Sequence, residues 1–290
     1  MFRCGLYQSI GLIDESTNPN SRTYEGKIGE CAMHSELVLF DLNDGVVTVT
    51  LNRPEVVNAL NGELVEALVD TFDRISKDSS IRCVVVQGAG RGFCSGADLR
   101  ERSVSTPREI RNHRDLLVKC VMHMQEMPIP VIASCHGGVV AGGMEFALSC
   151  DIRVGCPGSL WGLTEVRNAG AFPGVLGPVR LEKISSGLAR LLVFTGKLVP
   201  GEEAYRMGLI DVFCEDSERI AVTKELASTI TKNSRAGLAS AKRLMVRSGE
   251  SPLEVAAELS RALRCQLDGS ADAQEGVVAW LEGREPSFEE

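Results

Sequence analysis

Two glycine-rich segments each follow a run of apolar residues that predicts a buried strand, and each leads into an expected helix. The first runs from Gly88 to Asp98 and the second from His136 to Glu145. Glycine lets backbone N–H groups approach a ligand closely, and the N-terminus of a helix adds positive potential to such groups. Two loops of this kind can converge on a single oxygen atom. Tight turns that bind nothing have the same pattern, so the glycines alone leave both interpretations open.

Glu145 adds an ionisable group to the second loop. It closely follows Gly142 and Gly143 and opens an apolar run, Phe-Ala-Leu, at 146–148. A carboxylate in this position is either a first-turn acid that the helix dipole stabilises or a reactive group held beside an oxyanion hole. The spacing is compatible with both roles.

Other reactive side chains have no comparable arrangement. The ten cysteines include no C-x-x-C pair and the four histidines no H-x-x-x-H pair, so we predict no metal and buried thiols in a reducing compartment. The segment 92–96, Gly-Phe-Cys-Ser-Gly, also resembles a nucleophile elbow with Cys94 as the nucleophile of a hydrolase. However, Cys94 lies seven residues beyond Gln87, where the preceding strand is expected to end, and no acid and histidine pair follows in order.

Alternating strand and helix patterns surround the two loops. Asn43-Asp44-Gly45 between β-branched runs predicts a β-hairpin over 37–54. Continuous apolar runs predict buried strands, and apolar residues at helical spacing predict helices between them. Repeated strand and helix units with fully apolar strands predict an α/β fold with parallel sheets covered by helices. The expected strands are 83–87, 131–134 and 151–155, and the expected helices are 61–78, 107–127 and 144–150.

After Ser186 the pattern is helical only. We therefore divide the chain into an N-terminal extension at 1–33, a core at 34–200 and a helical region at 201–290. The expected helices of the C-terminal part are 186–195, 200–207, 217–231, 234–248, 251–267 and 272–281.

Composition restricts the classes of partner. The 290 residues carry a net charge of −8, and 44% of them are hydrophobic. These values are typical of soluble globular proteins and disfavour nucleic acid as the main ligand. No run of roughly 18 apolar residues predicts a membrane span. The opening MFRCGLYQSIGL has Arg3 and no acid before Asp14, so 1–33 is expected to be disordered or to target the protein, with the mitochondrion favoured over the cytoplasm.

The two loops and their flanks resemble the signature of the crotonase family, the enoyl-CoA hydratases and isomerases. The resemblance begins near Leu37 and extends to the C-terminus. Within it, 97–102 resembles in particular the 3-methylglutaconyl-CoA hydratases. The main segments are 92–99 and 141–151, with further pieces at 51–54, 58–60, 161–165, 172–174, 180–181, 195–196, 203–204 and 208–210.

The resemblance implies both a fold and an active site. The fold would be a crotonase-like spiral of repeated ββα units with an all-helical C-terminal part, assembled as a homotrimer or a dimer of trimers. The N–H groups of Ala97 and Gly142 would form an oxyanion hole, and Glu145 and Glu165 would be paired carboxyl groups. No separate cofactor is implied, because coenzyme A (CoA) is part of the thioester substrate. The implied contacts to CoA are Arg53, Val56, Ala59, Asp98, Arg100, Trp280 and Arg284.

The presence of both glutamates favours one reaction of the family, the hydration of a 2-enoyl-CoA in fatty acid metabolism. Hydration needs one carboxyl group to take a proton from water and another to deliver a proton to the α-carbon. An isomerase that uses a single glutamate stays open. RNA binding, known for a relative with a lysine-rich helix, is disfavoured because the helix at 61–78 carries five acids against Arg74 and Lys77, a net charge of −3.

Several positions depart from the family pattern. The stretch 166–172 is one residue longer than usual, and Val-Leu-Gly-Pro-Val at 175–179 stands where Gly-Gly-Thr-Gln is common. Ala141 replaces a frequent glycine, and Gly283 stands where a lysine is usual. We therefore expect an altered pocket near the acyl chain.

Overall fold

The described part of the chain opens with a β-hairpin. The computed structural model describes residues 36–249 and 251–288. Strands β1 (Val38–Asn43) and β2 (Val46–Leu51) pair antiparallel. Asp44 and Gly45 between them have φ values of 48° and 75°. Positive φ at both central residues is the geometry that Asp-Gly favours in a two-residue hairpin loop, so the predicted hairpin is confirmed. The expectations for 1–33 lie outside the described residues.

The hairpin forms one edge of a six-stranded sheet. From β2 onward all neighbouring strands of this sheet are parallel, as the apolar runs predict. Parallel strands are covered on both faces, which explains why their residues are apolar without alternation. The α/β class is therefore confirmed. The strand order is β1-β2-β3-β4-β6-β9, with β3 at Cys83–Gly88, β4 at Val131–Ser134, β6 at Ile152–Gly155 and β9 at Val212–Phe213.

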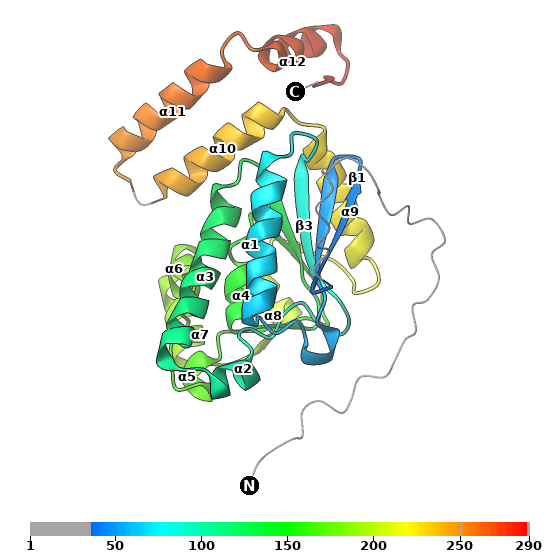
Figure 1. Ribbon diagram of the computed structural model, residues 1–290. Helices are drawn as coiled ribbons and strands as arrows, with labels where there is room; N and C mark the ends of the chain where they lie inside the picture. Colours follow the sequence, from blue (N-terminus) through cyan, green and yellow to red (C-terminus); the bar gives the residue numbers. More distant parts are fainter. Residues whose placement is uncertain (1–35, 250, 289–290) are drawn as a thin grey trace. The chain divides into compact units, whose positions relative to one another are not determined.

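Helices cover the two faces of this sheet (Figure 1). On one face, α1 (Gly62–Lys77) and α3 (Pro107–Glu126) pack side by side, and α4 (Gly142–Ala147) joins them around the larger hydrophobic cluster. On the other face, α9 (Arg219–Thr231) packs on the central strands over a smaller cluster. The Asn61 side chain caps α1 by accepting from the N–H of Leu64. The predicted helices at 61–78 and 107–127 are thus confirmed.

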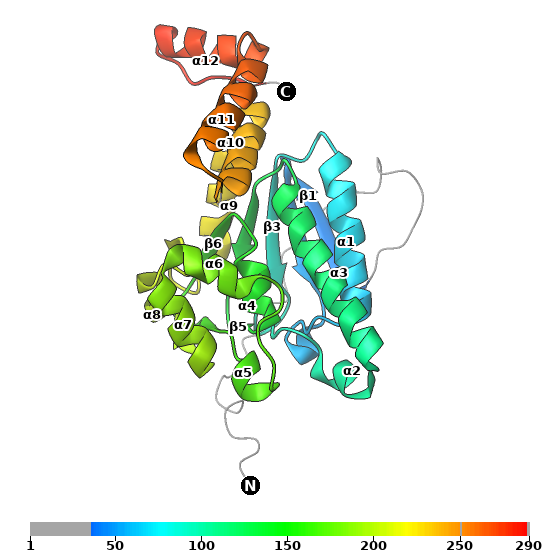
Figure 2. The same cartoon turned by 90° about the vertical axis from the view of Figure 1, so that its left-hand side faces the viewer.

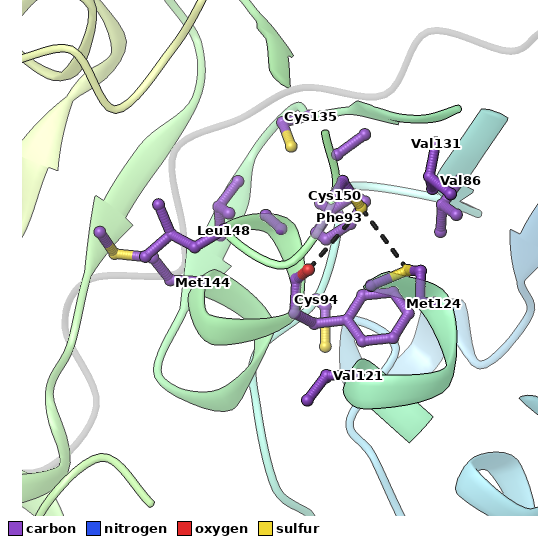
Figure 3. Close-up of a cluster of buried hydrophobic side chains, with 14 of the residues drawn as sticks. Val86, Phe93, Cys94, Val121, Met124, Val131, Cys135, Met144, Leu148 and Cys150 are labelled. Atoms are coloured by element: carbon purple, nitrogen blue, oxygen red, sulfur yellow. Dashed lines mark hydrogen bonds between the residues drawn. The ribbon is translucent and has the colours of Figure 1, made fainter. Parts of the chain in front are cut away.

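The larger cluster lies directly beneath the two glycine loops. Phe93 and Cys94 of the first loop are completely buried, and they pack with Met124 and other apolar side chains of α3 and α4 (Figure 3). The Sγ of Cys150 lies 3.8 Å from the Sδ of Met124. Among the described cysteines six are buried, Cys214 is partly buried and Cys265 is exposed, so buried thiols are confirmed for most of them. The loops therefore rest on a packed apolar base.

A second, three-stranded sheet corrects the expectations for the region after β4. Its strand β5 (Gly138–Val140) lies where the sequence predicts a loop, and β8 (Val199–Pro200) lies beyond Ser186, where no further strand is expected. Strands of two or three residues are too short to show a pattern of side chains. β9 also follows Ser186 and was not predicted. The predicted boundary between a core at 34–200 and a helical region at 201–290 stays a prediction. The other short elements, several of them visible in Figure 2, are η1 (Pro54–Val56), α2 (Leu99–Val104), β7 (Leu160–Gly162), α5 (Glu165–Asn168), α6 (Gly177–Ile184), α7 (Ser186–Thr195) and α8 (Gly201–Arg206).

Three helices follow α9, namely α10 (Arg235–Ser248), α11 (Leu253–Leu267) and α12 (Ala271–Glu282). They match the predicted helices within two residues at each end. Lys242 of α10 is buried, donates to the backbone O of Ile129 at 2.9 Å and forms an ion pair of 2.7 Å with Asp151. This cation joins α10 to the chain around β4 and β6. Within the described ranges, no helix is both long and apolar enough to cross a membrane.

Candidate active site

The two glycine loops run side by side. The N–H of Cys94 donates to Gly138 O at 2.9 Å, and the N–H of Val140 donates to Cys94 O at 3.0 Å, as in a short parallel ladder. Gly96 then adopts a φ of 90°, which glycine tolerates and other residues rarely adopt. A Cβ on Gly96 would lie 2.8 Å from the N of Gly142, so only glycine permits this close approach. The structure therefore brings the two loops together as their sequences suggested.

Ala97 and Gly142 meet at the end of this ladder. The position of a Cβ on Gly142 lies 3.6 Å from the N of Ala97. Across residues 36–249 and 251–288, no protein acceptor takes a hydrogen bond from the N–H of either residue. Gly142 is the first residue of α4, where backbone N–H groups have no partner within the helix. Two neighbouring, unused donors are the arrangement that stabilises an oxyanion.

Asn58 fixes the first loop, a role that the sequence analysis missed. Its buried side-chain amide donates to Gly92 O at 2.9 Å, Ala89 O at 3.0 Å and Phe93 O at 3.1 Å, and its Oδ1 accepts from the N–H of Arg53. Its φ of 53° is of the kind that asparagine adopts more readily than most residues. An asparagine within an otherwise apolar segment was the available signal, because a buried amide must find partners.

Arg53 and Asp98 form an ion pair of 3.0 Å that ties the segment before α1 to the first glycine loop. Asp98 also caps α2 by accepting from the N–H of Arg100 at 3.0 Å. Burial raises the pKa of Asp98, but Arg53 and the backbone N–H groups of α2 outweigh this effect and hold the pKa below its ordinary value. Among the expected CoA contacts, the structure brings together Arg53, Val56, Ala59, Asp98 and Arg100, since Arg53 also donates to Ala59 O and η1 ends at Val56.

The carboxyl group of Glu145 is held by backbone donors. Glu145 is 1% exposed, and its Oε1 accepts 2.8 Å hydrogen bonds from the N–H groups of Val175 and Gly177. The two donors flank Leu176, whose φ of 72° turns both N–H groups toward the same oxygen. Burial raises the pKa of Glu145, while these two donors and the charge of Arg180 counteract part of that rise. The unusual residues at 175–179 therefore preserve this contact, because it uses only the backbone.

Glu165 has a different environment. It is the first residue of α5, its Oε2 is buried, and no hydrogen-bond partner for this atom lies among the described residues. Burial, together with a smaller effect of the nearby charge of Glu145, raises the pKa of Glu165 to about 7. The two carboxyl groups thus interact, and Glu165 is the one with fewer stabilising donors. This difference allows one to be protonated while the other is ionised.

Arg180 lies behind Glu145 and was expected only as a piece of the family pattern. Its Nη1 donates to Val175 O at 3.2 Å, which supports the loop that binds Glu145. Its Nε is buried and makes no hydrogen bond with the described residues. Burial lowers the pKa of Arg180, and the charge of Glu145 opposes that change. Arg180 is therefore a partly buried cation whose charge favours the ionised form of Glu145.

Cys94 does not have the properties of a nucleophile. Its Sγ lies 3.2 Å from Asn58 O, and the side chain is completely buried. Burial raises the pKa of its thiol to about 12, whereas reactive cysteines have a lowered pKa and an exposed sulfur. These observations agree with the argument against a hydrolase.

Trp280 and Arg284 are not joined to the other candidates by any contact within the described part of the chain. Trp280 is 79% exposed on α12. Arg284 forms ion pairs with Glu275 and Glu282, both on the same helix, at 2.6 and 2.7 Å. Nothing within the described part of the chain therefore places these two residues in one CoA site with the other five expected contacts.

Comparison with known proteins gives a consistent result. The family model for enoyl-CoA hydratase/isomerase matches residues 41–290. The short-chain-enoyl-CoA hydratase of Clostridium acetobutylicum is 30% identical over 249 residues, which cover 85% of this chain and 95% of that protein. The human enoyl-CoA hydratase domain-containing protein 2, mitochondrial, is 29% identical and is covered to 86%, against 85% of this chain. A crystal structure of an enoyl-CoA hydratase from Bacillus anthracis superimposes with a TM-score of 0.84 at 29% identity, covering 87% of this chain and 98% of that one. The chain belongs to the enoyl-CoA hydratase/isomerase family, the crotonase family that its two glycine loops resemble.

Proposed function

We propose that the protein is a 2-enoyl-CoA hydratase, a hydro-lyase that adds water across the C2–C3 double bond of a thioester. The observation that carries this proposal is the contrast between two neighbouring carboxyl groups. Glu145 accepts two backbone hydrogen bonds, whereas burial raises the pKa of Glu165 to about 7, and its Oε2 has no hydrogen-bond partner among the described residues. Hydration uses such a pair, because it needs a proton acceptor and a proton donor in one step.

The thioester oxygen would accept from the N–H groups of Ala97 and Gly142. Both groups lack an acceptor among the described residues, and both lie at the meeting point of the loops. Addition of water to C3 places negative charge on this oxygen as an enolate develops. Loss of one donor of this kind costs about 3 kcal/mol of transition-state stabilisation.

In the proposed reaction, ionised Glu145 takes a proton from water while the water oxygen bonds to C3. The C2–C3 π electrons form the enolate, and protonated Glu165 delivers its proton to C2 as the thioester carbonyl is restored. One water molecule is consumed, and transfer of a proton from Glu145 to Glu165 returns both groups to their starting states. No further reactant and no cofactor enters this scheme.

The remaining parts of the proposal concern CoA, assembly and location. Arg53, Val56, Ala59, Asp98 and Arg100 would line one CoA site, and Trp280 and Arg284 would reach CoA from a neighbouring copy in a homotrimer or a dimer of trimers. The exposure of Trp280 and Leu281, 79% and 70%, supports such burial in an assembly. A mitochondrial location is favoured over a cytoplasmic one on the opening residues. The more specific resemblance to 3-methylglutaconyl-CoA hydratases stays a prediction.

The test is a substrate panel in which hydration is followed by loss of the conjugated enoyl absorbance and isomerisation of a 3-enoyl-CoA by its gain. It comprises crotonyl-CoA, a longer 2-enoyl-CoA, 3-methylglutaconyl-CoA and a 3-enoyl-CoA as isomerase substrate. We expect Glu145→Gln and Glu165→Gln each to lower kcat by about 10²- to 10⁴-fold while CoA binding persists. The double variant should be little worse than the worse single variant.

Two outcomes would contradict this proposal. Isomerisation of the 3-enoyl-CoA without hydration of any 2-enoyl-CoA would favour the isomerase, in which one of the two substitutions is nearly silent. Full hydratase activity in Glu165→Gln would exclude the two-carboxylate mechanism.

A further inference from the structure

Two cysteines lie side by side at one end of the six-stranded sheet. Strands β6 and β9 are parallel, and the last pair in their register is Gly155 with Phe213. Cys156 and Cys214 are the next residues of the two strands, and the N–H of Cys214 donates to Gly155 O at 3.2 Å. Neighbouring strands are about 4.8 Å apart, so the two cysteines occupy facing positions one step beyond the ladder.

Both cysteine side chains point toward α9. Val154 belongs to the smaller hydrophobic cluster under this helix, and its register partner Val212 packs against the same cluster. Side chains along a strand alternate between the two faces, so the residues two positions further on share this face. Cys214 also packs against the cluster, and the charge of Arg219, the first residue of α9, acts on the thiol of Cys156. The two thiols therefore lie on one face of the sheet.

The contacts of the Cys214 sulfur agree with this placement. Its Sγ lies 3.8 Å from Gly155 O, the carbonyl that directly precedes Cys156 in the chain. The two thiols are also close enough for an electrostatic effect of Cys214 on Cys156. Disulfides join Cα atoms that are roughly 4.4 to 6.8 Å apart, and facing residues of neighbouring strands fall within this range. The backbone therefore places the pair at a separation that a disulfide can span.

The two thiols differ in their access to solvent. Cys156 is buried, whereas Cys214 is partly exposed, so a reagent in solution reaches Cys214 first. The carboxylate of Asp216 accepts a hydrogen bond from the Cys156 thiol. The same carboxylate accepts from the N–H of Gly158 at 3.0 Å, which fixes its position. Cys156 thus has a proton acceptor at hand, although it is shielded from solution.

We propose that Cys156 and Cys214 are a site of reversible oxidation, at which a disulfide forms and joins β6 to β9. The oxidant is a small disulfide such as oxidised glutathione. The Cys214 thiolate attacks one of its sulfur atoms and releases the first glutathione thiolate, which takes up the proton lost by Cys214. Cys156 then attacks the Cys214 sulfur and releases the second glutathione, while Asp216 receives the Cys156 proton and passes it to that leaving group. Two protein thiols are oxidised, and one glutathione disulfide is reduced to two thiols.

The disulfide would close a covalent loop that includes part of the candidate active site. The segment between the two cysteines contains Glu165 and both backbone donors to Glu145. β9 has two residues and is the last strand in the order of its sheet. A cross-link restricts the unfolded chain and thereby stabilises the folded state. In a reducing compartment both cysteines stay thiols, so this added stability is expected only under oxidising conditions.

The test exposes the full-length protein to an excess of oxidised glutathione at mildly alkaline pH and then digests it without reduction. We expect a pair of peptides linked through Cys156 and Cys214, and a Tm about 5 to 15 °C above that of the reduced protein. Dithiothreitol should reverse both changes. Cys265→Ser removes an exposed thiol on α11 and should alter neither the link nor the Tm shift.

Single substitutions separate the two steps of the oxidation. In Cys156→Ala the reaction should stop at a mixed disulfide between Cys214 and glutathione, with no link and no such rise in Tm. In Cys214→Ala both the link and the Tm shift should be absent, because the remaining thiol is buried. Cooperative unfolding of both variants in their reduced forms shows that these losses do not come from misfolding.

Two results would overturn the proposal. One is an oxidised wild type in which Cys156 stays a free thiol. The other is a Tm shift of the same size in Cys214→Ala, which would assign the stabilisation to other cysteines of the chain.

Discussion

The N–H of Gly177 donates a 2.8 Å hydrogen bond to Glu145 Oε1, although the two residues are 32 positions apart in the chain. The contact is close enough that a Cβ on Gly177 would lie 2.6 Å from Glu145 Cγ. The position of the carboxyl group thus depends on a loop that lies between α5 and α6. Arg180, on the first turns of α6, supports this loop through Val175 O.

We expect Arg180→Met to move the acidic limb of the pH profile of kcat/KM to higher pH. The charge of Arg180 favours ionised Glu145, so its removal raises the pKa of that carboxyl and the base is protonated at a higher pH. Arg180→Lys should restore part of the shift. Arg190→Met, at an exposed position of α7 that pairs with Glu182, serves as the control. A lower kcat with an unmoved acidic limb would mean that Arg180 only supports the loop.

Glu165 should make the stability of the protein depend on pH. Burial raises the pKa of Glu165 from 4.5 to about 7, so the folded state holds this proton more tightly than the unfolded state. The resulting stabilisation is present below pH 4.5 and is lost as pH rises through 7, up to about 3 kcal/mol in the free energy of unfolding. Urea unfolding at pH 5 and pH 8 should show this loss in the wild type and a smaller loss in Glu165→Gln. The exposed Glu202→Gln variant is the control, and an identical pH dependence in wild type and Glu165→Gln would contradict the prediction.

Gly96→Ala should separate the two oxyanion donors. Gly96 has a φ of 90°, which alanine rarely adopts. The added Cβ would also lie 2.8 Å from the N of Gly142, so we expect the two loops to move apart. We expect hydratase kcat to fall about 10²- to 10³-fold, as for loss of one donor. Gly187→Ala in α7 is the matched control, because nothing lies within 4 Å of its Cβ position. Activity in Gly96→Ala equal to that of Gly187→Ala would show that the loop contact is unimportant.

Cys94→Ala should leave hydration within a few-fold of the wild type. The thiol is buried and only the neighbouring backbone belongs to the proposed site, so we expect a loss of about 1 to 2 kcal/mol in the free energy of unfolding from the small cavity. The exposed Cys265→Ala should change neither quantity. Complete loss of activity in a folded Cys94→Ala protein would restore the hydrolase interpretation.

The sequence predicted the elements that have a periodic pattern. The helix α3 and the strand β4 follow from apolar spacing and run length, and their bounds agree with the prediction to within one residue. Strands β5 and β8 were missed because two or three residues carry no periodicity, and their pairing depends on distant partners. The same limit applies to β9, whose partner β6 lies far earlier in the chain.

The candidate site likewise contains some residues that the sequence could identify and others that it could not. Glu145 and the glycines could be identified because their chemical types are unusual within apolar segments. The donors to Glu145 could not, because Val175 and Gly177 act through the backbone, and their side chains say nothing about that contact. The effect of the charge of Arg180 on Glu145 likewise becomes visible only when the loop after α5 is placed beside α4.

The buried amino group of Lys242 can be used to measure how often α10 separates from the rest of the fold. Its amino group is enclosed by two backbone carbonyls and the carboxylate of Asp151, and that carboxylate also accepts from the N–H of Val131. Reagents that acylate amines therefore reach Lys242 only after α10 has separated from β4 and β6. The labelling rate of this one lysine, relative to the exposed lysines on the surface, reports how often the C-terminal helices detach from the sheet.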